Sequence, residues 1–218
     1  MRWSDRPVWL LPVLATVICV GIGLAVFLGT GGQGRLAAPT AQESGRALIG
    51  GPFELVNHEG ETVTEADFAG RPMLIYFGFT YCPDVCPMSL QVMAAALDQL
   101  EPDARAEFQT LLISVDPERD TPELLAQYVT SEAFPEGLTG LTGTPEQVRR
   151  AAEAYRVFYR RSEQDGSMAE YLVDHSSIIY FMDRQGQFVE AFPHATSPAQ
   201  IARRLQRFLE EEGSGSSA

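Results

Sequence analysis

Two cysteines spaced four positions apart, Cys82 and Cys86, are the residues of this chain best suited to chemistry. They follow an apolar segment at 73–78 and precede an amphipathic helical pattern. Three other predicted helices begin with a hydroxyl residue followed by proline, and Cys86-Pro87 fits the same pattern. We therefore expect the Cys86 sulfur at a helix N-cap, where unpaired backbone N–H groups favour the thiolate.

The cysteine pair alone leaves redox and metal chemistry open. On a helical turn the two sulfurs share one face, within reach of a disulfide after modest rearrangement, and both thiolates could also converge on one soft metal ion. Three residues separate the cysteines, whereas two are typical of thioredoxin-like redox motifs. A purely structural disulfide is the weakest alternative, because closing so small a loop removes little entropy from the unfolded chain.

A histidine decides between these alternatives. His175 precedes a predicted strand at 177–182, and its loop is expected to approach the turn that carries the cysteines. Two thiolates and one imidazole form a soft three-donor site that suits Cu(I) or Cu(II), whereas structural zinc sites almost always have four protein ligands. Cys82, Cys86 and His175 are therefore candidate copper ligands, and a loop histidine that takes no part in a metal site is the alternative for His175.

The other candidate residues have weaker roles. Asp174 is expected to orient the His175 imidazole from outside the ligand set. Asp84 could be a weak ligand, but its position favours a turn residue. His58, in a predicted hairpin turn, and His194, beside a proline, are expected to face solvent.

The order of predicted elements indicates an α/β protein with a thioredoxin-like fold, a mixed central sheet flanked by helices. A small hairpin at 53–63 precedes buried strands at 73–78 and 110–115. Helices follow from Thr121-Pro122 and Thr144-Pro145, with 138–141 left ambiguous and 162–170 a polar excursion. A hairpin at 177–192 and a helix from Ser197-Pro198 close the domain.

The N-terminal region predicts a membrane anchor. Residues 8–28 carry no charge and are long enough to span a bilayer, after a short cytoplasmic segment at 1–7. A cleaved signal peptide is the alternative. Residues 29–47 have the composition of a flexible linker, 48–211 form the domain, and 212–218 are a disordered tail. The domain would then lie on the periplasmic or other extracytoplasmic side of the inner membrane.

The composition narrows the partners. The formal net charge is -13, and every basic residue is an arginine. This acidic balance excludes nucleic acid as a partner, because its phosphates would be repelled.

If the cysteines act as a redox pair, the chain is instead an extracytoplasmic thiol–disulfide oxidoreductase or a peroxide-reducing relative.

Four motifs carry a resemblance to a known family. YFGFTYCPDVCPMSL, ISVDPERDTPE, YRVFYR and YLVDHSSIIYFMDRQG, in that order, resemble the Sco/SenC family of membrane-tethered copper chaperones of cytochrome c oxidase assembly. The resemblance runs from about Leu48 to Leu209. It implies a thioredoxin-like fold that binds one copper ion through Cys82, Cys86 and His175. It also implies that the chain is not primarily an enzyme, and that it delivers copper to the dinuclear site of oxidase subunit II or prepares that site by thiol reduction, with other copper chaperones as further partners.

Overall fold

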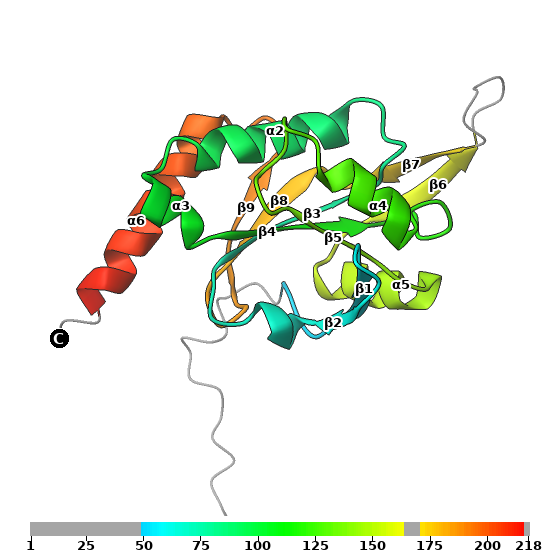
Figure 1. Cartoon of the computed structure of the whole chain (residues 1–218), viewed down its shortest axis with the longest axis horizontal. Helices are drawn as coiled ribbons and strands as arrows, with labels where there is room; N and C mark the ends of the chain where they lie inside the picture. Colours follow the sequence, from blue (N-terminus) through cyan, green and yellow to red (C-terminus); the bar gives the residue numbers. More distant parts are fainter. Residues whose placement is uncertain (1–48, 164–170, 216–218) are drawn as a thin grey trace, which may run out of the picture. The chain divides into compact units, whose positions relative to one another are not determined.

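The computed structural model describes residues 49–163 and 171–215 (Figure 1). The predicted cytoplasmic segment, membrane anchor and linker, and the last three residues of the predicted tail, lie outside the described residues. Within the described ranges, no helix combines the length and the apolar character needed to cross a membrane.

A seven-stranded mixed sheet forms the centre of the domain, in the order β2-β1-β5-β4-β3-β8-β9. The central strands β3, β4 and β5 run parallel, and the strands on both sides are antiparallel. This is the predicted mixed sheet with its antiparallel closing hairpin. The bounds are β1 Glu54–Asn57, β2 Thr62–Thr64, β3 Met73–Gly78, β4 Gln109–Ser114, β5 Thr139–Thr142, β8 Ile178–Met182 and β9 Phe188–Pro193.

Helices cover both faces of the sheet (Figure 1). Tyr76 is in register with Leu112, which is in register with Gly140, so these residues share one face. On that face α2 packs over β3, α4 packs over Gly140, and α6 packs against α2. The opposite face carries Phe77, which contacts Tyr155 at the end of α5. The bounds are η2 Glu65–Phe68, α2 Val85–Leu97, α3 Pro102–Ala106, α4 Pro122–Val129, α5 Pro145–Ala154 and α6 Pro198–Gly215.

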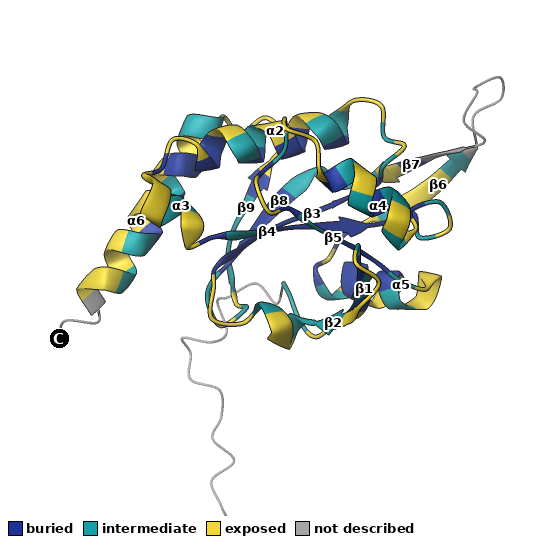
Figure 2. Cartoon of the chain, viewed as in Figure 1, coloured by how far each residue is buried: buried dark blue, intermediate teal, exposed yellow. Residues whose placement is uncertain are grey.

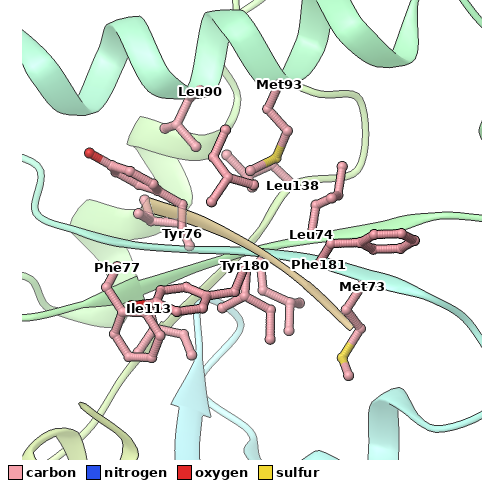
Figure 3. Close-up of a cluster of buried hydrophobic side chains, with 14 of the residues drawn as sticks. Met73, Leu74, Tyr76, Phe77, Leu90, Met93, Ile113, Leu138, Tyr180 and Phe181 are labelled. Carbon is pink, nitrogen blue, oxygen red and sulfur yellow. The ribbon is translucent and has the colours of Figure 1, made fainter. Parts of the chain in front are cut away.

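The hydrophobic core lies on both faces of the central strands (Figure 2). Every residue of β3 is buried, as expected for a continuously apolar strand between two helical layers. Figure 3 shows Leu90 and Met93 of α2 packing onto one face of the sheet, above Tyr76, while Phe77 lies on the other face. The strand that leads to the cysteines is therefore fixed by packing on both of its faces.

Three predicted helix starts are confirmed. The Thr121 hydroxyl accepts a hydrogen bond from the Leu124 N–H, at 3.3 Å. Thr144 forms the predicted capping box with Gln147. Ser197, directly before α6, is bonded through its backbone N–H and its hydroxyl to the side chain of Gln200. These caps satisfy backbone N–H groups that a helix leaves unpaired.

The main difference from the predicted elements is a second, two-stranded sheet. Strands β6 (Tyr159–Glu163) and β7 (Tyr171–His175) form an antiparallel ribbon in a region expected to be helix end and polar excursion. The helix ends earlier than expected, at Ala154, because Arg156 adopts a left-handed backbone with φ 57°. Residues 164–170 of the excursion lie outside the described residues.

Three smaller differences concern the remaining boundaries. The ambiguous segment at 138–141 is strand β5, at 139–142. Helix α3, which was not predicted, follows Glu101 with a proline at its first position. The last helix continues to Gly215, beyond the domain boundary predicted at 211.

Candidate metal centre

The two cysteines lie at the junction of β3 and α2, as predicted, but their roles are exchanged. Helix α2 begins at Val85, with Asp84 as its N-cap residue, so Cys86 lies inside the first turn. The expectation that Cys86 caps this helix is wrong. Pro87 is therefore the third residue of the helix rather than the first. A proline fits there because backbone N–H groups in the first turn need no partner within the helix.

The sulfur at the helix N-terminus belongs to Cys82. Its Sγ accepts a hydrogen bond from the Cys86 N–H, at 3.3 Å. Hydrogen bonds from the Cys86 side chain and from backbone N–H groups lower the pKa of Cys82 to about 4. Cys86 is fully buried, and this burial, together with the neighbouring Cys82 sulfur, raises the pKa of Cys86. Both cysteines are free, so the pair combines a partly exposed thiolate with a buried thiol.

His175 reaches the cysteines from the ribbon. It is the last residue of β7, and its Nε2 lies 3.2 Å from the Cys86 Sγ. Its Nδ1 lies 3.2 Å from the Ser176 carbonyl oxygen, which can only accept a hydrogen bond. Nδ1 therefore carries the proton, and the Nε2 lone pair is directed at the sulfur. The edges of the Tyr76 and Phe79 rings pack against the imidazole, with centroids 5.9 Å and 5.8 Å away.

Neither aspartate has the outer role expected for Asp174. The Asp174 carboxylate is exposed and forms an ion pair with Arg160 at 3.5 Å. Successive residues of a strand point to opposite faces, so Asp174 points away from the side to which His175 points. The Ser176 carbonyl oxygen orients the imidazole instead. Asp84 is exposed at the start of α2, in agreement with its interpretation as a turn residue.

Three positions that sequence reasoning did not single out hold the cysteine turn in place. A Cβ on Gly78 would lie 3.1 Å from the Cys86 Sγ and 2.8 Å from Cε1 of Tyr76, so only glycine leaves room for this sulfur. The fully buried Asp120 accepts hydrogen bonds from the Thr80 N–H, the Thr80 hydroxyl and the Ser114 hydroxyl. Tyr76 lies beneath the site. The sequence signal available for Asp120 was its place in the ISVDPERDTPE motif, two positions after Glu118.

The two remaining histidines do not join the site, but neither is simply solvent-facing. His58 Nδ1 accepts a hydrogen bond from the Gly140 N–H at 3.1 Å. His194 Nδ1 lies 3.2 Å from the Ser89 hydroxyl, and both imidazoles are partly buried. Backbone and hydroxyl contacts therefore account for both side chains.

The three predicted ligands are brought together by folding. Cys82 Sγ, Cys86 Sγ and a ring nitrogen of His175 all lie within 4.8 Å of one another. Among the described residues, this is the group of cysteine, histidine and acidic side chains compact enough to hold a metal ion. Two sulfurs and one nitrogen are the donors that soft metal ions prefer.

Comparison with known proteins shows the family of this chain. The family model SCO1/SenC matches residues 41–210. The chain belongs to the SCO1/SenC family. Protein SenC of Rhodobacter capsulatus is 38% identical over 212 residues, which cover 96% of this chain and 93% of that protein. Protein SCO1 homolog, mitochondrial, of Homo sapiens is 43% identical over 162 residues, 74% of this chain and 53% of that protein.

Solved structures of SCO1/SenC relatives share the fold. The crystal structure of Arabidopsis thaliana ScoI with copper bound has a TM-score of 0.69 and 38% identity, and covers 75% of this chain and 99% of that one. The structure of Bradyrhizobium japonicum ScoI with copper bound has a TM-score of 0.64 and 39% identity. The match covers 73% of this chain and 98% of that one. The chain spans about half the length of the first curated relatives that it matches.

Proposed function

We propose that this chain is a copper metallochaperone that binds one copper ion through Cys82, Cys86 and His175. The observation that carries the proposal is the meeting of these three side chains, with donor atoms within 4.8 Å of one another, from the turn after β3, the first turn of α2 and the end of β7. The set contains two sulfurs, which favour Cu(I), and an imidazole nitrogen, which also suits Cu(II). Two similar solved structures hold copper, which supports the same choice of metal.

The arrangement of the donors suits transfer rather than permanent binding. The group has three donors, fewer than the four protein ligands of a structural zinc site. A recipient protein can therefore add its own thiolate to the copper before the chaperone releases it. Cys82 is the partly exposed donor of the pair, so an incoming ligand meets it first.

The surface around the site suits a protein partner. In the part of the chain that the structure describes, the exposed large apolar side chains are Tyr81 at 53%, Met88 at 43% and Phe158 at 65%. Each adjoins a different donor: Tyr81 precedes Cys82, Met88 follows Cys86 on α2, and the Phe158 carbonyl bonds the N–H next to His175. Exposed apolar side chains gathered at one place are typical of protein interaction sites.

We propose the dinuclear copper site of cytochrome c oxidase subunit II as the recipient, reached by copper delivery or by thiol reduction, with other copper chaperones as further partners. The resemblance to the Sco/SenC family supports this choice. We also propose that residues 8–28 anchor the chain in the inner membrane and that the domain lies on its periplasmic side. The uncharged span and the preceding arginines support the anchor, which would raise the local concentration of the domain near membrane partners.

The second candidate function is thiol–disulfide exchange. The lowered pKa of Cys82 and the buried Cys86 behind it resemble an attacking thiolate with a resolving thiol. Forming a disulfide between the Cys82 thiolate and the Cys86 thiol would transfer two electrons to a partner disulfide, which would become two thiols by taking up the Cys86 proton and one proton from solvent. This chemistry uses both sulfurs and does not require His175.

The deciding experiment is the His175→Ala variant of the full chain, fully reduced and titrated with Cu(I) against a chromophoric chelator. We expect a loss of affinity of at least about tenfold, because one of three donors is removed. His58→Ala is the matched control, since that imidazole bonds the Gly140 N–H away from the site, and it should keep the parental affinity. Parental Cu(I) affinity in His175→Ala would refute the three-donor site.

A second assay separates the two candidate functions. The copper-free chain is tested for insulin reduction, and the copper-loaded chain is tested for transfer to the isolated copper domain of subunit II. A chaperone transfers copper to that domain and reduces insulin slowly. Rapid insulin reduction that survives in His175→Ala, without copper transfer, would favour the oxidoreductase.

A further inference from the structure

The Tyr76 hydroxyl is a buried polar group with no hydrogen-bond partner. Tyr76 is 0% exposed and lies in the middle of β3, among residues that are all buried. In Figure 3 its ring lies beneath α2 beside Leu90, and its hydroxyl oxygen extends from the edge of the apolar cluster. The oxygen is inaccessible and makes no hydrogen bond with the described residues.

Such an arrangement destabilises the metal-free domain. Burial of a hydroxyl without a partner forfeits its hydrogen bonds to water and gains none in return. Phenylalanine would fill the same space without this cost. The hydroxyl therefore calls for an explanation in a second state of the site.

The position of the ring supplies that explanation. A Cβ placed on Gly78 would be 2.8 Å from Cε1 of Tyr76 and 3.1 Å from Sγ of Cys86, so these two atoms lie within about 6 Å of each other. The oxygen faces Cys86, Ser89 and Ser177 without reaching hydrogen-bond geometry. Of these three neighbours, the Cys86 sulfur is the one whose charge changes when a metal binds, because a metal-bound cysteine is a thiolate.

Resting on the proposed copper-binding function, we propose that Tyr76 is a positioning residue whose hydroxyl donates a hydrogen bond to the Cys86 sulfur when that sulfur binds copper. A metal-bound cysteine is a thiolate, which accepts hydrogen bonds strongly, whereas a neutral thiol accepts them weakly. A phenol hydrogen rotates freely about its C–O bond, so it can point at the sulfur once the oxygen and the sulfur come within hydrogen-bond distance. The hydroxyl thus lowers the stability of the empty site and raises that of the loaded site.

The test is Tyr76→Phe in the full chain, which removes the hydroxyl and keeps the ring against His175. A hydrogen bond to a charged group is worth about tenfold or more in affinity, so the Cu(I) affinity should fall by that factor. In the Cu(II) form, the sulfur-to-copper charge-transfer band should move to lower energy, because the sulfur orbitals lose the stabilising donor. The melting temperature of the metal-free variant should equal or exceed that of the parent.

Tyr128→Phe is the matched control, because the Tyr128 hydroxyl is also buried and without a hydrogen-bond partner. It should leave copper affinity and the charge-transfer band unchanged. Parental affinity and an unmoved band in Tyr76→Phe would overturn the inference, as would equal losses in both variants or a lower melting temperature of metal-free Tyr76→Phe. Failure of the parent chain to bind copper would instead refute the proposed function.

Discussion

Gly78→Ala tests whether the strand backbone holds the Cys86 sulfur in place. The added methyl group would lie 2.8 Å from Cε1 of Tyr76, about 0.6 Å short of ordinary contact at 3.4 Å, and 3.1 Å from the Cys86 Sγ, about 0.3 Å short. All three residues are buried, so neither neighbour can turn into solvent. Overpacking of this kind lowers the free energy of unfolding by about 1–3 kcal/mol. It should also lower the melting temperature by about 2–4 °C for each kcal/mol in a chain of this size.

The same displacement should weaken copper binding. Metal–ligand distances tolerate only about 0.2 Å, so movement of the Cys86 sulfur by a few tenths of an ångström should lower Cu(I) affinity by at least about tenfold. The assays are urea denaturation of the metal-free chain and chelator competition. Gly140→Ala is the control. Gly140 lies on β5, away from the site, and its added methyl group would lie 3.1 Å from Val129 of α4. It should be destabilised similarly but bind copper as the parent does. Parental copper affinity in a destabilised Gly78→Ala would refute the reasoning.

Two further predictions concern the cysteine turn. In the reduced, metal-free chain, iodoacetamide should modify Cys82 before Cys86, as followed by mass spectrometry. The rate at Cys82 should be nearly constant between about pH 6 and 8, because a thiol with a pKa of about 4 stays ionised throughout that range. A rate that rises about tenfold per pH unit would contradict this. Asp120→Ala should lower the free energy of unfolding in urea by about 3 kcal/mol, because the Thr80 and Ser114 donors lose their buried acceptor. A change below about 1 kcal/mol would show that these donors find other partners.

The sheet could be predicted because its strands obey simple patterns. Met73–Gly78 is continuously apolar, and it is the fully buried central strand β3 with the predicted bounds. The hydroxyl–proline pairs at Thr121 and Thr144 predicted helix starts correctly, because an N-cap followed by proline fits few other conformations. The apolar strand determines where the cysteine turn is placed, because that turn directly follows β3.

The ribbon could not be predicted, because its residues continue a helical pattern. Val148, Ala151 and Tyr155 repeat at helical spacing, and Phe158 extends the pattern by one more turn. The structure ends the helix at Ala154 and leaves Phe158 exposed, so the apolar residue that suggested more helix belongs to the entry to β6. A left-handed arginine, Arg156, gives no sequence signal of the kind that glycine gives.

The assignment of the two sulfurs failed for a similar reason. A two-residue shift in where α2 begins moves Cys86 from the cap into the buried first turn, and spacing alone does not determine that shift. Burial, which depends on the packing of Leu90 and Met93 onto β3, then decides which thiol loses its proton readily. Such differences between chemically identical residues arise only in the folded chain.

The unequal burial of the two sulfurs gives ligand exchange a direction. If copper binds here as proposed, a competitor arriving from solvent would replace the Cys82 sulfur first, while the Cys86 sulfur and the His175 imidazole remain as ligands. Loading would follow the reverse sequence, with Cys86 bound early and Cys82 last. The proposed donor and the proposed recipient would then have to approach the same face in turn.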